Sequence, residues 1–153
     1  MNRSGRQHKT TANGSAANKI DADTFRRAEE AVSKLAEQYR EWAQSDIEML
    51  RDLLTKLNAD SPDRADVYDK IRAIAHDMRG QGSTFGYPLI TRIARSISHT
   101  IKEGSGDEAI DALVQAHVDA MADIVDNSLD GDGGDDGARV IKDLEAALER
   151  ALD

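Results

Sequence analysis

The spacing of apolar residues restricts this chain to one kind of secondary structure. Apolar side chains recur every three or four residues, most clearly at Phe25, Ala28, Val32, Leu35, Tyr39 and Trp42. This spacing places them on one face of an α-helix. No segment alternates apolar and polar residues as a half-buried strand does. We therefore predict an all-α fold.

Five or six such segments with short connections bury their apolar faces most simply as an antiparallel bundle. We expect an up-down-up-down four-helix bundle with a long N-terminal helix and an accessory C-terminal helix. The first helix should run from about Asp23 to Leu57, and the polar residues 44–46 leave open whether it is one long helix or a kinked pair. The second should run to about Phe85. We expect the second helix to start at Ser61–Pro62, as cap and first residue, the third at Pro88 and the fourth at Asp107. A last helix should carry Val140, Ile141, Leu144, Leu148 and Leu152.

The two ends of the chain differ in composition. Residues 1–20 are basic and polar without apolar periodicity, which is typical of a disordered tail. Residues 21–153 should form the bundle domain, with a flexible acidic loop at 130–137 that lacks the ligand set and closing glutamate of a calcium-binding EF-hand. The N-terminus has no apolar signal core, and no apolar run approaches the ~20 residues that span a bilayer. We expect a cytoplasmic protein that does not bind membranes.

Charge and cysteine content exclude several classes of function. The formal net charge is −9, and the acidic residues are spread through the sequence, whereas nucleic-acid binding requires a concentrated basic surface. The chain has no cysteine, so disulfides, thiolate zinc sites and thiol catalysis are impossible. Protein partners are therefore expected.

His76 is predicted to lie on a face of the second helix that does not contribute to the core. On a helical wheel, Val67, Ile71, Ala75 and Met78 share the core face of the second helix, and His76 lies about 150° from the centre of that face. An exposed imidazole is largely neutral near pH 7, so its ring nitrogen is available as a nucleophile toward phosphorus.

The residues one turn from His76 suit a phosphoryl group. Arg79 and Arg72 can hold it through charge-assisted hydrogen bonds. Glycine inside a helix costs about 1 kcal/mol relative to alanine, so Gly80 and Gly82 call for a reason. We expect Gly80 to clear the surface for a partner and Gly82, on the core face, to permit close helix packing. The expected partner-binding residues are Arg72, Ala73, Gly80 and Ser83.

The segment around this histidine resembles the signature of histidine-phosphotransfer (HPt) domains, whose usual form is His-x-Leu-Lys-Gly-Ser-Ser-x-x-Leu-Gly. Here it reads His76-Asp77-Met78-Arg79-Gly80-Gln81-Gly82-Ser83-Thr84-Phe85-Gly86. The histidine and the glycines at positions 80 and 86 match, and Gln81 departs from the usual small serine. With a bundle around it, the resemblance extends over roughly residues 24–128.

This resemblance implies a phosphoryl carrier in a two-component phosphorelay and not an enzyme. His76 would accept the group and Arg79 would stabilise it. The partners would be response-regulator receiver domains and a sensor or hybrid histidine kinase. The receiver aspartate would exchange the phosphoryl group with the histidine in the presence of Mg²⁺. The carrier itself would need no cofactor and no metal.

Other interpretations of the same residues remain. His76 could be an incidental surface histidine on a helical adaptor or scaffold that binds a signalling partner without carrying phosphate. A metal-dependent bundle enzyme is weaker, because no Glu-x-x-His or His-x-x-x-His pair places ligands on one helix face. His117 falls on an apolar stripe, which favours a core or boundary role, and His99 should be an exposed bystander. The long first helix could kink, protrude or mediate dimerisation.

Overall fold

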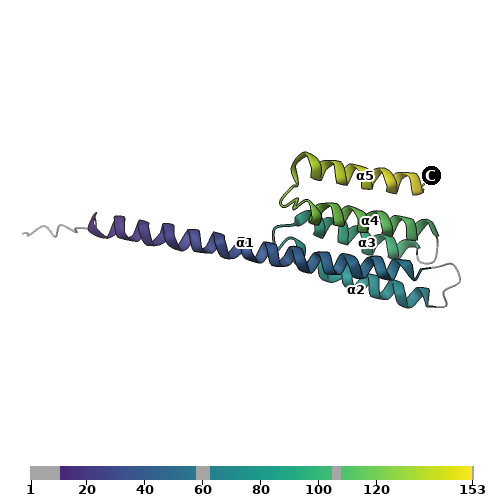
Figure 1. The fold of residues 1–153 in the computed structure, drawn as a ribbon. Helices are drawn as coiled ribbons and strands as arrows, with labels where there is room; N and C mark the ends of the chain where they lie inside the picture. The colour runs from purple at the N-terminus through teal and green to yellow at the C-terminus, as the bar shows by residue number, and fades with distance from the viewer. Residues whose placement is uncertain (1–10, 58–62, 105–107, 153) are drawn as a thin grey trace, which may run out of the picture. The chain divides into compact units, whose positions relative to one another are not determined.

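The computed structural model describes residues 11–57, 63–104 and 108–152, and their regular secondary structure is entirely helical (Figure 1). The all-α prediction is confirmed. The chain divides into two units, Met1–Leu35 and Ala36–Asp153. The helices are α1 (Thr11–Thr55), α2 (Arg64–Gly82), α3 (Pro88–Gly104), α4 (Glu108–Asp126) and α5 (Gly134–Leu152).

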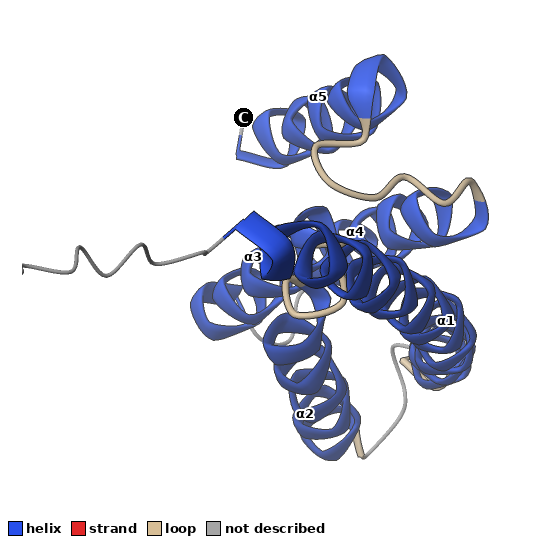
Figure 2. Ribbon diagram, turned by 90° about the vertical axis from the view of Figure 1, so that its left-hand side faces the viewer, coloured by secondary structure: helices blue, strands red, loops and turns tan. Residues whose placement is uncertain are grey.

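In the unit Ala36–Asp153, the α1 residues together with α2, α3 and α4 form the expected up-down-up-down bundle (Figures 1 and 2). Helix α5 packs on α4, outside the four-helix arrangement and on the opposite side from α2. The core consists of apolar residues from every helix together with buried tyrosines, and its largest fully buried side chains include Tyr39, Leu50, Ile71, Met78, Ile90, Ile97 and Met121. The accessory helix therefore leaves the outer face of α2 uncovered.

Helix α1 is continuous from Thr11 to Thr55, so the polar residues 44–46 do not interrupt it. The prediction that it starts near Asp23 was wrong. Strong helix formers such as Ala16 and Ala17, with no proline, sustain a helix even where no apolar stripe marks it. Residues 1–10 of the predicted disordered tail lie outside the described residues, and the boundary at residue 20 stays a prediction.

In the unit Met1–Leu35, the described apolar side chains of α1 are exposed. Phe25 is 66% exposed, Val32 65% and Leu35 47%. Their neighbours are charged residues such as Arg26, which pairs with Asp23 at 3.1 Å.

Three predicted boundaries need correction. Helix α2 ends at Gly82 instead of Phe85, and a turn follows in which Gly86 adopts a φ of +91°. Helix α5 begins at Gly134, so the second half of the predicted acidic loop is helical. A carboxylate of Asp132 accepts the N–H of Gly134 at 2.9 Å, and acidic residues in the first turn favour a helix start. Helix α2 begins at Arg64 after Asp63, so the predicted helix start at Pro62 was wrong. Ser61, Pro62 and Asp107 themselves lie outside the described residues.

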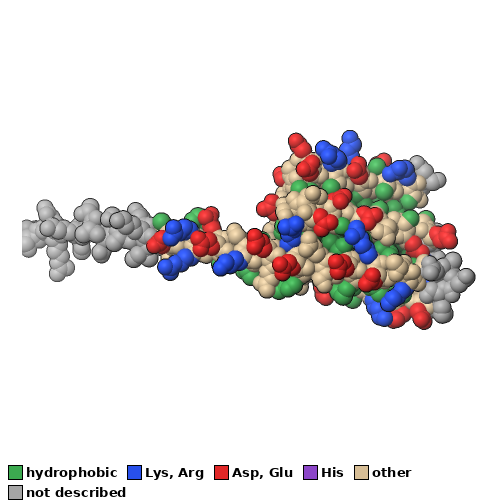
Figure 3. Space-filling view, viewed as in Figure 1, with side chains coloured by type: hydrophobic (Ala, Val, Ile, Leu, Met, Phe, Trp, Pro, Cys, Tyr) green, Lys and Arg blue, Asp and Glu red, His purple; other side chains and the backbone are tan. Residues whose placement is uncertain are grey.

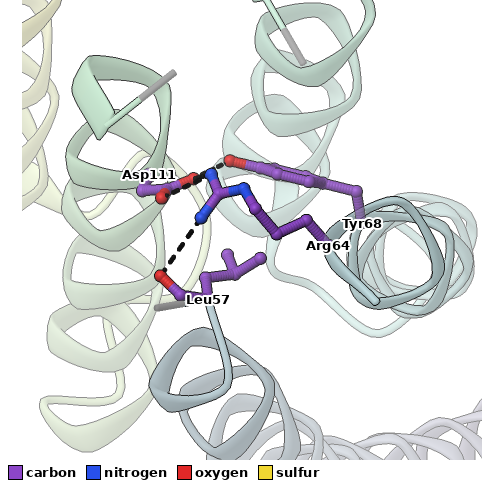
Figure 4. A network of polar contacts seen from close by, with 4 residues as sticks. All are labelled: Leu57, Arg64, Tyr68 and Asp111. Atoms are coloured by element: carbon purple, nitrogen blue, oxygen red, sulfur yellow. Dashed lines mark hydrogen bonds and ion pairs between the residues drawn. The ribbon is translucent and has the colours of Figure 1, made fainter. Parts of the chain in front are cut away.

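A polar network joins three helices at one end of the bundle (Figure 4). Arg64 at the start of α2 donates to both carboxylate oxygens of Asp111 on α4, at 2.8 and 3.0 Å, and to the carbonyl of Leu57 after α1, at 3.2 Å. The hydroxyl of Tyr68 also donates to Asp111. The side chains of Arg64 and Asp111 are each 18% exposed, so this paired contact is better shielded than the surface ion pairs.

His117 is fully buried on α4, as the sequence predicted. Its Nδ1 lies 2.6 Å from the carbonyl of Leu113, which can only accept, and its Nε2 lies 2.7 Å from the hydroxyl of Ser96 on α3. Nδ1 therefore carries the proton and Ser96 donates to Nε2. The ring is then a neutral imidazole whose two nitrogens both have hydrogen-bond partners. Burial lowers the pKa of His117, while the hydrogen bond to Leu113 opposes that shift.

This burial predicts an acid-sensitive bundle. The pKa of His117 is lower in the folded chain than the usual value of about 6.5, so the unfolded chain binds the proton more tightly. The contribution of His117 to stability is complete above about pH 6.5 and falls as the pH drops toward the folded pKa. Urea unfolding measured from pH 7.5 to 5 should show this loss. His117→Gln should flatten the profile and His76→Gln, an exposed control, should not; equal profiles for wild type and His117→Gln would contradict the assignment.

Candidate functional site

His76 lies on the outer face of α2, and its side chain is exposed, as the helical wheel predicted. The opposite face of α2 is buried through Val67, Tyr68, Ile71, Ala75, Met78 and Gly82. The ring of His76 has no hydrogen-bond partner within the described part of the chain. Its nitrogens are therefore open to a reacting group from outside.

A shallow depression surrounds His76 between α2 and α3. The residues that line it are Asp69, Arg72, Ala73, His76, Asp77, Arg79 and Ser98. We call it the His76 depression. It brings together four residues that the sequence singled out, namely His76, Arg72, Ala73 and Arg79. Ser98 is contributed by α3, and its hydroxyl donates to the carbonyl of Ala94 at 3.4 Å.

The two arginines of the His76 depression differ in their surroundings. Arg72 pairs with Asp69 on its own helix at 3.2 Å. The guanidinium of Arg79 has no ion-pair partner among the described residues. Arg79 is therefore the cation whose charge is uncompensated beside His76, whereas Arg72 would first have to leave Asp69.

Two further depressions lie on the α1 side of α2. One is lined by Trp42, Ser45, Asp46, Asp77 and Gln81. Burial and then the charge of Asp77 raise the pKa of Asp46 there. The other is mainly apolar and is lined by Met49, Asp52, Leu53, Lys56, Lys70, Ala73 and Ile74. Charges of both signs therefore surround His76, because Asp69 and Asp77 line the His76 depression together with the two arginines. Charges of both signs are likewise interspersed on the face shown in Figure 3.

The two glycines of α2 occupy different environments. A Cβ on Gly80 would meet nothing within 4 Å, so the surface beside His76 is open there. A Cβ on Gly82 would lie 2.7 Å from Oγ1 of Thr91 and 2.8 Å from the carbonyl oxygen of Tyr87. The prediction that Gly82 permits close helix packing is confirmed.

Gly80 and Ser83, which the sequence assigned to partner binding, do not line the His76 depression. The backbone N–H of Ser83 donates to Oγ1 of Thr91 at 2.8 Å, and its hydroxyl lies 3.0 Å from the same atom. Ser83 is exposed but is held in an internal contact. A role for either residue in partner binding stays a prediction.

Sequence reasoning missed Ser98, Thr91 and Asp46. Each belongs to a helix other than α2, so no spacing within α2 could have placed it near His76. In the sequence, Asp46 is marked only as one of the polar residues 44–46 of α1. A helical wheel describes one helix, and the neighbours across a groove follow from packing.

No group of three or more His, Cys, Asp or Glu side chains in the described ranges could hold a metal ion. None of the described helices is both long and apolar enough to cross a membrane.

A family model described as "Hpt domain" matches residues 34–131, which include α2, α3, α4 and the C-terminal part of α1. Neither the curated proteins nor the solved structures contain a significant match to the chain.

The two glycines provide a test of this local geometry. Gly80→Ala should stabilise the protein by about 1 kcal/mol, because alanine is the better helix former and its methyl group meets open space. Gly82→Ala should destabilise it by roughly 1–3 kcal/mol, because backbone atoms of Tyr87 and Thr91 leave no room. Denaturant unfolding of both variants measures the difference. Equal effects of the two substitutions would contradict the close approach at Gly82.

Proposed function

Because the chain belongs to the Hpt domain family of phosphorelay proteins, we propose that it relays a phosphoryl group between His76 and the aspartate of response-regulator receiver domains. The observation that supports this best is an unpartnered, exposed imidazole in a depression that also holds the uncompensated charge of Arg79. The accessory helix α5 lies on the far side of the bundle from α2, so a protein of domain size can approach His76.

In the proposed step, the lone pair of a neutral imidazole nitrogen attacks the phosphorus of an aspartyl phosphate. The N–P bond forms as the bond between phosphorus and the carboxyl oxygen breaks, and the aspartate leaves as a carboxylate. The other ring nitrogen keeps its proton. The reverse sequence returns the group to a receiver. Mg²⁺ and the groups that stabilise the leaving carboxylate belong to the partner, so the carrier needs no kinase activity of its own.

Arg79 is the residue we assign to holding the phosphoryl group. It lies three residues after His76, on the same face of α2 and in the same depression. A guanidinium that is already neutralised would gain less from an added anion, which disfavours Arg72 with its 3.2 Å contact to Asp69. The hydroxyl of Ser98 on α3 would have to leave the carbonyl of Ala94 before it donated to the phosphoryl group.

We assign partner contact to the outer face of α2 and the adjoining α1 surface. Trp42 and Met49 are 46% and 45% exposed and line the two α1-side depressions. Exposed aromatic and methionine side chains are enriched in protein interfaces. Ala73 lines both the apolar depression and the His76 depression. Its small side chain leaves space between the α1 surface and His76. A receiver domain as acceptor and a sensor or hybrid histidine kinase as the source of phosphate are the partners that this function requires.

The decisive test is transfer of labelled phosphate from a phosphorylated receiver domain. Wild type should acquire label that is labile in acid and stable in alkali, as expected for a phosphoramidate. His76→Gln should acquire none, and His99→Gln, which removes an exposed histidine outside the depression, should match wild type. Label that persists in His76→Gln would contradict the assignment. Receiver binding without transfer by wild type, across a panel of receivers, would favour the adaptor.

Substituting the arginines separates their roles. A charge-assisted hydrogen bond contributes about 1.5–3 kcal/mol, so Arg79→Ala should slow transfer by roughly tenfold or more. Arg72→Ala should have a smaller effect. The opposite order would contradict the assignment of Arg79.

We also propose that the first unit mediates self-association. All the exposed large hydrophobic side chains in the described residues belong to α1. Within Met1–Leu35 the stripe of Phe25, Ala28, Val32 and Leu35 has the 3-4-3 spacing of a coiled-coil seam, and Ala31 beside it is small and uncharged. Such a seam is complemented by the same seam of a second copy.

Sedimentation equilibrium tests this proposal. Wild type should associate with rising concentration, and Val32→Glu should be monomeric because it places a charge in the seam. Ser33→Glu, on the polar face of the same helix, should behave as wild type. A wild-type chain that stays monomeric at the highest concentration reached would contradict self-association.

A further inference from the structure

The hydroxyl of Thr91, in the first turn of α3, is inserted into the end of α2. It donates to the carbonyl of Arg79 at 2.9 Å and accepts the backbone N–H of Ser83 at 2.8 Å. The hydroxyl of Ser83 lies 3.0 Å away and supplies a second donor. A threonine hydroxyl has one proton and two lone pairs, so all its hydrogen-bonding capacity is used.

The two backbone groups that Thr91 joins are four residues apart. The N–H of Ser83 and the carbonyl of Arg79 are the pair that would form the next i to i−4 hydrogen bond of α2. Thr91 contacts both members of this pair, while Ser83 keeps helical dihedral angles of φ −63° and ψ −36°. The hydroxyl therefore ties α3 to the last turn of α2. That turn carries Arg79.

Gly82 makes this insertion possible. Its missing Cβ would lie 2.7 Å from the Thr91 hydroxyl and 2.9 Å from the Thr91 nitrogen. Any larger residue would therefore push α3 away from the end of α2 and separate the hydroxyl from its partners. We call the arrangement of Arg79, Gly82, Ser83 and Thr91 the Thr91 clasp.

We infer that Thr91 is a positioning residue for phosphoryl transfer, an inference that rests on the proposed function. The Thr91 clasp fixes the backbone of Arg79 and with it the point from which the guanidinium extends toward His76. Without the hydroxyl, the carbonyl of Arg79 and the N–H of Ser83 lose their link to α3, so the backbone from which the guanidinium extends is held less firmly. Thr91 lies outside the lining of the His76 depression and acts through Arg79.

Two substitutions at position 91 isolate the hydroxyl. Thr91→Val has nearly the same shape and lacks it, and Thr91→Ser retains it. Thr91→Val should slow transfer from a phosphorylated receiver about tenfold or more, because small displacements of a catalytic group have effects of this size. Its affinity for the receiver should be unchanged, and Thr91→Ser should transfer nearly as wild type. Wild-type transfer rates in Thr91→Val, or no rescue by serine, would overturn the inference.

A double-mutant cycle distinguishes positioning from a general loss of structure. If Thr91 acts through Arg79, adding Thr91→Val to Arg79→Ala should slow transfer no further. Effects that multiply would assign Thr91 to the scaffold and overturn the inference. Thr91→Ala allows the same cycle if the valine variant does not fold. Absence of transfer by wild type would instead refute the proposed function, so the two failures are distinguishable.

Discussion

The close approach of α2 and α3 at Gly82 is the constraint on which the candidate site depends. Two helices meet there with no space for a Cβ, and the backbone of Tyr87 and Thr91 fills the gap. This contact ends α2 and fixes how α3 leaves the turn. It therefore determines that Ser98 of α3 comes to line the His76 depression. A looser contact would leave His76 on an isolated helix surface with no neighbouring wall.

The two faces of α2 differ because the rest of the bundle covers only one of them. Residues such as Ile71 and Met78 are fully buried and hold α2 in the core. The outer face receives no covering helix, since α5 packs on α4 instead. Arg79 lines the His76 depression without an ion-pair partner among the described residues, although Asp69 and Asp77 line it too. An anion on His76 is therefore attracted by Arg79 in particular.

Paired polar contacts in the interior support this surface, while the buried hydroxyl of Tyr39 has no hydrogen-bond partner among the described residues. The ion pair between Arg64 and Asp111 joins the starts of α2 and α4 at one end of the bundle. His117 is buried as a neutral ring between Ser96 and Leu113 and so takes no part in surface chemistry. A frame that presents the exposed imidazole of His76 suits the phosphoryl carrier that we propose.

The sequence by itself determined the helical class, the order of the helices and the exposure of His76, because each depends on periodicity within one segment. It also indicated that Gly82 permits close helix packing, because a glycine on a core face otherwise only weakens the helix. It misplaced the starts of α1 and α5, where local capping and alanine propensity act without an apolar stripe. Only the tertiary structure decided that Thr91 and Ser98 lie near α2, because contacts between helices depend on packing distances that no single segment encodes.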